Sequence, residues 1–256
     1  MTELVVAGLQ MDVAWGDRRA NFERVRRFAA EAKADGAALL VLPEMFATGF
    51  LLDPGITAED EGGETAAFLA ALARDHGLAV VGGYVRRLPS GKGANVAAAF
   101  DADGRALAEY AKVHLVTALG EKDAHEPGDG PRPFAVGGAR AACYVCYDLR
   151  FPELFRLEAA STDLAIVIAS WPSQRQRHWD SLLPARAIEN QQFVVGVNRV
   201  GTGGGLEFLG GTAIYAPNGD ALAFGGAREE LVVAALDLDL VAQTRAAFPA
   251  LGDRRL

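Results

Sequence analysis

The residue best placed to do chemistry in this chain is Cys146, which ends an apolar run and precedes a sharp turn. The segment reads Cys143-Tyr144-Val145-Cys146-Tyr147-Asp148-Leu149-Arg150-Phe151-Pro152-Glu153. Residues 136–146 predict a buried strand, and Pro152 predicts the first turn of a helix, because proline suits the first helical position. A thiol at such a junction faces a pocket. Nearby backbone N–H groups and Arg150 are expected to favour its thiolate, the nucleophilic form.

An inert role is the commoner one for a cysteine, since free cysteines usually pack as small apolar side chains. We keep that interpretation for Cys143, whereas the charged residues directly after Cys146 are poor company for a core residue. The two cysteines also form the Cys-x-x-Cys spacing of redox and zinc motifs. Residues three apart on a strand point to opposite faces, however, and the chain has no other cysteine to complete a zinc site. We therefore expect no bound metal.

Composition restricts the classes of protein that fit. The chain has 256 residues, of which 50% are hydrophobic, enough for one large α/β domain spanning 1–256. Its formal net charge of −8 disfavours nucleic acid and anionic membranes as partners, because both reward clustered basic residues. The amino-terminal residues lack both a basic signal-peptide pattern and a membrane-spanning run, and the cysteines are too close to form a useful disulfide. These features predict a cytoplasmic protein.

Short apolar runs alternate with longer amphipathic segments along the chain. Strands are expected at 4–9, 38–42, 78–85, 95–100, 106–112, 140–146, 164–169, 193–197, 211–215, 221–224 and 231–236. Helices are expected at 18–33, at 64–76, after Pro152 and from about 178 to 191. Asp103-Gly104 and Asn218-Gly219 are hairpin signals, which predict mixed rather than purely parallel sheets. The glycine-rich run 201–205 is expected to be a flexible loop. It does not fit a dinucleotide fingerprint, because a strand pair and not a helix is expected after it.

Two further charged residues stand at the ends of apolar runs. Glu44 follows Leu-Leu-Val-Leu-Pro, and Lys112 follows the run that ends at Ala111. Each alone fits a salt-bridged side chain or one that reaches out to solvent. In α/β folds, however, the carboxyl ends of the strands line the ligand crevice. Glu44, Lys112 and Cys146 are therefore expected to converge on one site.

The sequence resembles the nitrilase, or carbon–nitrogen hydrolase, superfamily through three motifs in the family's order. They are Leu42-Pro43-Glu44-Met45-Phe46, Tyr110-Ala111-Lys112-Val113-His114-Leu115 and Val145-Cys146-Tyr147-Asp148-Leu149-Arg150-Phe151-Pro152-Glu153. Secondary matches are Gln10-Met11-Asp12, Ala169-Ser170-Trp171-Pro172 and Arg186-Ala187-Ile188-Glu189-Asn190-Gln191. The resemblance implies a four-layer α-β-β-α sandwich of two mixed β-sheets flanked by helices. It also implies pairing with a second copy of the chain as a homodimer.

The resemblance implies a role for each motif. Cys146 would attack the carbonyl carbon of an amide and form a thioester, while Glu44 would take the thiol proton and deliver it to the departing ammonia. Lys112 and the main-chain N–H of Tyr147 would stabilise the oxyanion. A second family glutamate matches Glu121, and the nearby Glu126 is its rival. This mechanism requires no cofactor.

The motif set resembles in particular the omega-amidase branch, which hydrolyses terminal monoamides of dicarboxylates such as 2-oxoglutaramate and 2-oxosuccinamate. Arg150 stands where some relatives that hydrolyse N-carbamoyl amino acids bind a carboxylate, and a guanidinium can hold one bidentately. Its alternative is a structural ion pair with Asp148 or Glu153. Trp171 is expected to wall the substrate pocket, with ordinary core packing as its alternative.

Other functions stay open at this point. A Cys–His hydrolase would use His114, His125 or His178 as its base, but spacing singles out no carboxylate partner for any of them, and Glu44 would have no role. Nitriles, aliphatic amides and N-carbamoyl amino acids would use the same three residues as an omega-amidase. A binding module without activity would be expected to lack at least one of the three. The sequence leaves the physiological amide open.

Overall fold

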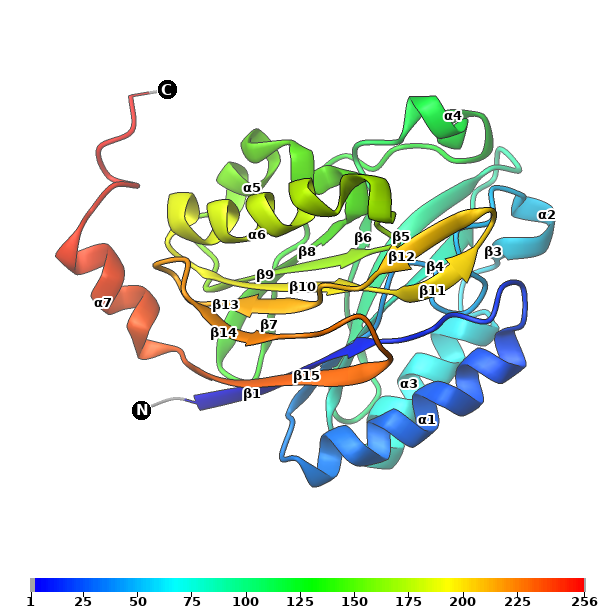
Figure 1. Ribbon diagram of the computed structural model, residues 1–256, viewed down its shortest axis with the longest axis horizontal. Coiled ribbons are helices and arrows are strands. Elements are labelled where there is room, and N and C mark those ends of the chain that lie inside the picture. The colour runs from blue at the N-terminus through cyan, green and yellow to red at the C-terminus, as the bar shows by residue number, and fades with distance from the viewer. Residues whose placement is uncertain (1–2, 256) are drawn as a thin grey trace.

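Two mixed β-sheets are stacked face to face, and helices cover both outer faces (Figure 1). The computed structural model describes residues 3–255; Met1, Thr2 and Leu256, which the predicted domain 1–256 includes, lie outside the described residues. The layers follow the expected order, helix, sheet, sheet, helix. The α-β-β-α sandwich predicted from the resemblance is therefore confirmed.

The first sheet has the order β15-β1-β2-β4-β5-β6, with β3 beside β4. Its strands are β1 (Glu3–Gln10), β2 (Leu39–Val41), β3 (Ala58–Glu59), β4 (Ala79–Arg87), β5 (Gly93–Phe100), β6 (Ala106–Ala111) and β15 (Glu230–Asp237). The pairs β1–β2 and β2–β4 are parallel, whereas β4, β5 and β6 form an antiparallel meander. The chain therefore leaves β2 and β6 at the points where Glu44 and Lys112 follow.

The second sheet has the order β14-β13-β10-β9-β8-β7. Its strands are β7 (Phe134–Val136), β8 (Ala139–Val145), β9 (Leu164–Ala169), β10 (Phe193–Asn198), β13 (Ala213–Tyr215) and β14 (Ala221–Phe224). The central strands β8, β9 and β10 run parallel, so their carboxyl ends meet at one edge. Cys146 follows β8 directly, and Ser170 follows β9.

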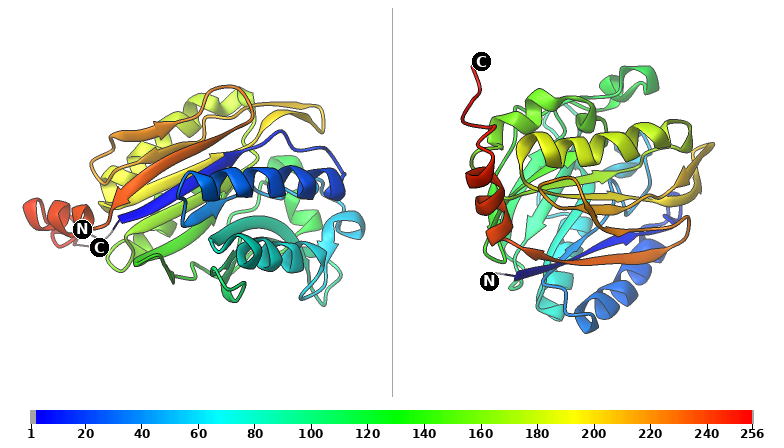
Figure 2. Two further views of the ribbon diagram at one scale, coloured as in Figure 1. Left: turned by 90° about the horizontal axis from the view of Figure 1, so that it is seen from below. Right: turned by 60° about the vertical axis from the view of Figure 1, so that its left-hand side comes forward.

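Helices α1 (Arg18–Ala34) and α3 (Glu64–His76) cover the first sheet, while α5 (Pro152–Glu158) and α6 (Gln176–Asn190) cover the second (Figure 2). The remaining helices are α2 (Pro54–Thr57), α4 (Glu121–Ala124) and α7 (Asp239–Ala247), and 3₁₀ turns occupy Thr117–Leu119, Cys146–Arg150 and Ser173–Arg175. Within residues 3–255, no helix combines the length and the apolar character needed to cross a membrane.

The first sheet is covered on one face by the second sheet and on the other by α1 and α3. Successive side chains on a strand point to opposite sides, so they enter these two cores in turn. Leu39 and Val41 pack into the core between the sheets, whereas Leu40 and Leu42 pack into the core beneath α1 and α3. This explains why β2 is apolar without interruption. Glu44 follows this strand and is itself buried, so its charge needs polar partners within the fold.

Two details of the predicted pattern are wrong. Residues 136–146 are not one strand, because Gly137 and Gly138 both have positive φ and form a turn between the antiparallel strands β7 and β8. The glycine-rich run 201–205 is not a flexible loop. It belongs to a hairpin of β11 (Val200–Gly203) and β12 (Leu206–Leu209), whose turn is made by Gly204 and Gly205. Both turns need the left-handed backbone that glycine adopts freely.

Gly83 on β4 fits tightly against the segment that carries Glu44. A Cβ atom there would lie 2.8 Å from the Cα of Glu44, from the N of Met45 and from Cδ1 of Ile168. Two of these are backbone atoms, which yield little. We expect Gly83→Ala to lower the free energy of unfolding by about 1–3 kcal/mol, the usual cost of overpacking.

Urea unfolding checks this prediction. Gly226→Ala is the matched control, since a Cβ at that position meets only Glu230 Oε1 at 3.4 Å. Equal stability of the two variants would contradict the tight packing argued for Gly83.

Candidate active site

Cys146 begins the turn after β8 with its backbone in the left-handed region, at φ 48°. This conformation is uncommon for a residue other than glycine and is held only where the surroundings determine it. The buried carboxylate of Asp148 does so here. It accepts hydrogen bonds from the N–H of Val145 at 3.1 Å, from the N–H of His114 at 2.9 Å and from the Tyr110 hydroxyl at 2.7 Å. The predicted placement of the thiol at a strand-to-helix junction is confirmed, since α5 follows.

Glu44 lies after β2 with both carboxylate oxygens engaged. Oε1 accepts from Asn95 Nδ2 at 2.8 Å and from Lys112 Nζ at 3.2 Å, and Oε2 accepts from the N–H of Ser170 at 2.8 Å. The Ser170 hydroxyl donates to the Glu44 carbonyl at 3.2 Å. The next residue, Met45, has φ 47°, so strained backbone flanks Glu44 as it does the thiol. The carboxylate is fully buried and accepts hydrogen bonds from three groups, while a fourth bond holds the backbone carbonyl of Glu44.

Lys112 lies between two buried carboxylates. Besides Glu44, its ammonium contacts both oxygens of Glu121 at 2.9 Å. Glu121 also accepts from the N–H of Val116 at 2.8 Å and from Asn95 at 3.1 Å. Its rival Glu126 is half-buried and lines a separate hollow. Of the two glutamates, Glu121 is the one that reaches Lys112.

The charges of this cluster stabilise one another. Burial favours the neutral form of Lys112, but Glu44 and Glu121 outweigh it and raise the pKa of the ammonium. Burial likewise acts to raise the pKa of Glu121, yet the charge of Lys112 and further hydrogen bonds lower it to about 2. Both groups are therefore ionised at neutral pH.

The resting form of Cys146 differs from the expectation. Burial, and then the negative charge of Glu44, raise the pKa of the thiol well above its usual range, and Lys112 offsets this only in part. The predicted thiolate is therefore wrong, because the carboxylate beside the sulfur disfavours a second negative charge. Cys146 therefore rests as a thiol, and Glu44 is the largest charge that acts on it. Cys143 is buried in the core between the sheets, and burial raises its pKa to about 12.

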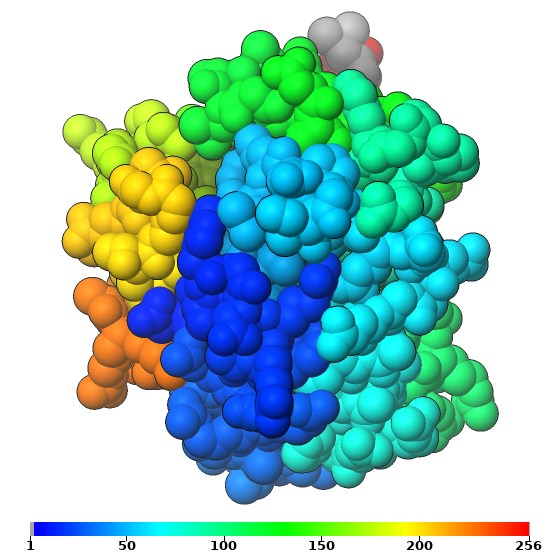
Figure 3. Space-filling view, turned by 90° about the vertical axis from the view of Figure 1, so that its right-hand side faces the viewer, coloured from blue at the N-terminus to red at the C-terminus, as the bar shows by residue number. Residues whose placement is uncertain are grey.

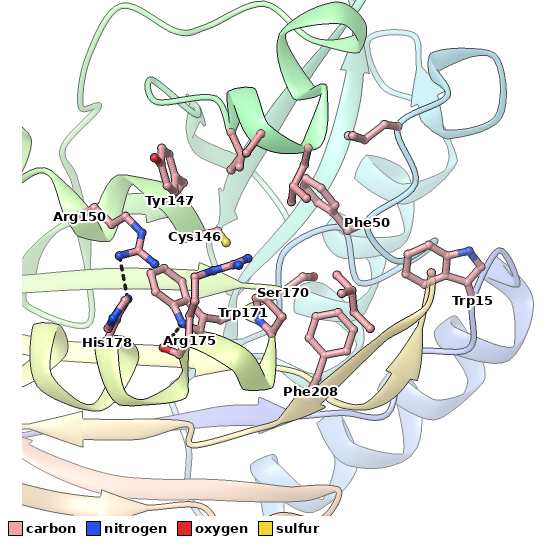
Figure 4. A pocket seen from close by; sticks show the side chains of 17 residues that line it. Trp15, Phe50, Cys146, Tyr147, Arg150, Ser170, Trp171, Arg175, His178 and Phe208 are labelled. Carbon is pink, nitrogen blue, oxygen red and sulfur yellow. Dashed lines mark hydrogen bonds between the residues drawn. The ribbon is translucent and has the colours of Figure 1, made fainter.

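A cavity of about 520 Å³ opens at Cys146 (Figure 4). Its lining residues are Trp15, Phe50, Leu52, Val116, Ala118, Leu119, Cys146, Tyr147, Arg150, Ser170, Trp171, Pro172, Arg175, His178, Gly204, Leu206 and Phe208. Several come from loops at one end of the sandwich, where the yellow β11–β12 hairpin, the blue segment around α2 and the green segment around α4 adjoin (Figure 3). The volume suits a small ligand held by a few polar groups among apolar walls.

The predicted substrate-binding residues Tyr147, Arg150 and Trp171 all line this cavity. Arg150 does not pair with Asp148 or Glu153; instead its guanidinium meets His178 Nδ1 at 3.1 Å. It also lies over the indole of Trp171, 4.7 Å from the ring centroid. Trp171 is 2% exposed, so it serves as core packing and cavity wall together. The structural ion pair that was the alternative for Arg150 is therefore not formed.

The three histidines considered as bases have other partners. His114 binds Asp148 at 2.9 Å, His125 lies 3.6 Å from Glu121, and His178 contacts Arg150. Of the three, only His178 lines the cavity at Cys146, whereas Glu44 is the largest charge that acts on the thiol. This placement favours Glu44 over a histidine as the base.

Two residues that complete the site were missed in the sequence. Asn95 bridges Glu44 and Glu121, and its signal was a polar side chain in the apolar strand β5. Arg175 gave no signal, because it stands in a polar run that reads as solvent-exposed.

Comparison with known proteins agrees with this geometry. The chain matches the carbon–nitrogen hydrolase family over residues 5–246. It is 34% identical to the 2-oxoglutaramate amidase of Bacillus subtilis, covering 98% of this chain and 97% of that protein, and 32% identical to the omega-amidase YafV of Escherichia coli K12, covering 99% and 97%. The structure of XC1258 from Xanthomonas campestris, a CN-hydrolase superfamily protein with an arsenic adduct in its active site, superposes with a TM-score of 0.94 at 31% identity, covering 100% of this chain and 98% of that one.

The fold and the site define a hydrolase of the nitrilase superfamily. The chain belongs to the carbon–nitrogen hydrolase family, whose members cleave carbon–nitrogen bonds.

The lowered pKa of Glu121 makes a prediction for stability. A carboxylate whose folded pKa lies at about 2, below the ordinary value of 4.5, stabilises the fold fully above pH 4.5, and this contribution is lost as the pH falls toward 2. The shift corresponds to about 3 kcal/mol. We therefore expect Glu121→Gln to lower the free energy of unfolding strongly at pH 7 and progressively less below pH 4.5.

Urea unfolding between pH 7 and pH 3 measures this difference. Glu126→Gln is the control and is expected to change stability by no more than about 0.5 kcal/mol at pH 7, as for most surface substitutions. A loss for Glu121→Gln that stays constant with pH would refute the linkage to Lys112.

Proposed function

We propose that this chain is a cysteine-dependent amidase that hydrolyses the terminal amide of a small carboxylate-bearing substrate to an acid and ammonia. The observation that carries the proposal is the buried, fixed carboxylate of Glu44, whose charge acts on the Cys146 thiol at a cavity that Arg150 lines. A base beside a protonated nucleophile, with a cation beside the base, is what amide cleavage requires.

In the first step, Glu44 takes the thiol proton as the sulfur attacks the amide carbonyl carbon. The resting thiol makes this base necessary, because little thiolate exists before attack. Negative charge then develops on the carbonyl oxygen. Lys112 has three N–H bonds: one serves Glu44, and one is shared by the two oxygens of Glu121, each 2.9 Å away. The third is available to the oxyanion, together with the main-chain N–H of Tyr147.

In the second step, the carbon–nitrogen bond breaks, Glu44 returns the proton to the leaving nitrogen and ammonia departs. The acyl group remains on Cys146 as a thioester. Glu44 then takes a proton from water, which attacks the thioester and releases the acid and the restored thiol. Atoms balance without a metal or cofactor in any step.

The substrate class rests on the chain's relatives and on Arg150. The 2-oxoglutaramate amidase and omega-amidase relatives are named for terminal amides of this kind. A guanidinium at the cavity wall matches the carboxylate of 2-oxoglutaramate or 2-oxosuccinamate. We propose these monoamides as the substrates. Pairing as a homodimer and a cytoplasmic location stay predictions.

Ammonia release from a substrate panel tests the proposal. The panel holds 2-oxoglutaramate, 2-oxosuccinamate, an aliphatic amide, an N-carbamoyl amino acid and a nitrile. We expect the two oxo-acid monoamides to be preferred. Preference for another compound of the panel would leave the proposed mechanism in place but contradict the proposed substrate class.

Cys146→Ala is expected to reduce this turnover by at least about 10³-fold, as removal of a nucleophile does. Cys143→Ala, a matched thiol three residues away and buried in the core, should retain most of the activity. Circular dichroism checks that both variants fold. Turnover that survives in Cys146→Ala would overturn the mechanism.

Lys112→Met is expected to lower kcat by about 10²–10³-fold, the range for loss of an oxyanion donor. The methionine matches the length of the lysine stem but supplies no N–H and leaves Glu44 and Glu121 without their cation. Steady-state kinetics on the preferred amide measure kcat, and thermal unfolding separates loss of chemistry from loss of fold. A folded variant with unchanged kcat would remove Lys112 from the oxyanion role.

A further inference from the structure

Two arginines face the same cavity, and neither has a carboxylate partner. Arg150 and Arg175 both line the space at Cys146. Within residues 3–255, neither guanidinium forms an ion pair with an acidic side chain. Figure 4 shows both side chains among the residues that line the cavity at Cys146. Unpaired cations crowded together on a half-buried wall repel each other, so an anion bound between them would relieve an unfavourable arrangement.

Trp171 organises both arginines. Its ring Nε1–H donates to the carbonyl oxygen of Arg175 at 2.8 Å, and the N–H of Arg175 donates to the carbonyl of Pro172 at 3.0 Å. Its ring face carries the guanidinium of Arg150 at 4.7 Å. The backbone of Trp171 is held by Asn198, whose side-chain Oδ1 accepts from the main-chain N–H of Trp171 at 2.7 Å. Trp171 therefore fixes the guanidinium of Arg150 and the backbone from which the Arg175 side chain extends, which favours a preorganised anion site.

The charges around the site agree with this arrangement. Burial, and next the nearby charge of Arg175, lower the pKa of Arg150. None of the 17 residues that line the cavity, all in the described part of the chain, is an aspartate or a glutamate. The acids of the catalytic cluster lie behind the cavity wall and are already engaged with Lys112.

We infer that Arg175 is a specificity-determining residue that binds the substrate's carboxylate together with Arg150, and that this pair selects a 2-oxo acid over the corresponding 2-amino acid. The inference rests on the proposed amidase function and assigns its substrate recognition to a second guanidinium. A ligand with a carboxylate satisfies both cations. A 2-ammonium group next to that carboxylate would meet two positive charges and no acid.

The test compares substrates of equal length that differ in charge. Glutaramate carries a terminal carboxylate, pentanamide replaces it with a methyl group, and L-glutamine adds a 2-ammonium group. We expect Arg175→Gln to lower kcat/KM for glutaramate by about tenfold or more, as for loss of a charge-assisted hydrogen bond, mostly through KM. Turnover of pentanamide should stay within about twofold, and the discrimination against L-glutamine should shrink.

Arg177→Gln is the matched control. Arg177 stands two residues away on α6, is exposed and does not line this cavity. It should leave all three rates within about twofold. Arg150→Gln should behave like Arg175→Gln, and Arg175→Lys should recover part of the loss because it restores the charge without the fork.

A binding measurement separates recognition from chemistry. In the Cys146→Ala background, calorimetry with glutarate as the probe is expected to show at least about tenfold weaker affinity when Arg175 is also changed to Gln. Equal losses on glutaramate and pentanamide, or an unchanged preference for glutaramate, would overturn the role of Arg175 while leaving the proposed function intact. A wild-type enzyme that favours pentanamide over glutaramate would instead overturn the proposed substrate class as well.

Discussion

The candidate active site and the packing of the two sheets around it depend on a buried ammonium held between two buried carboxylates. Taking three charges out of water costs several kcal/mol for each ion unless every one finds partners. Lys112 has Glu44 and Glu121, and the oxygens of both acids are further satisfied by Asn95 and by backbone N–H groups. These partners come from both sheets and from the loop after β6. The cluster can therefore form only when the two sheets pack in one register.

Strained backbone serves the same constraint. Cys146 and Met45 both adopt left-handed conformations, which side chains other than glycine rarely choose. One residue is the proposed nucleophile and the other follows the proposed base. The hydrogen bonds of Asp148 and Ser170 secure the two turns, so the strain is held by buried polar contacts. These contacts stabilise the fold and at the same time fix the orientation of the Cys146 side chain.

Periodic patterns and short motifs were the features that could be predicted from the sequence. The alternating apolar runs gave the central strands, and the motifs around Glu44, Lys112 and Cys146 gave the main side chains of the site. Longer-range details escaped it. Asn95 lies on β5 and donates to two acids that are far away in the chain, and Arg175 lines the cavity from the 3₁₀ turn before α6. Neither position belongs to a motif with a fixed spacing along the chain, so the sequence alone does not indicate it.

The raised pKa of Cys146 changes how the site is understood. Backbone N–H groups and Arg150 were expected to favour the thiolate, yet burial, and then the charge of Glu44, raise the pKa of the thiol. A neutral thiol is a poor target for oxidants, because the thiolate is the reactive form. It becomes a nucleophile only when the base beside it accepts a proton, which a bound amide can couple to attack. Burial raises the energetic cost of the ion cluster, and it also raises the pKa of Cys146. The proposed nucleophile therefore stays protonated until an amide substrate binds in the cavity.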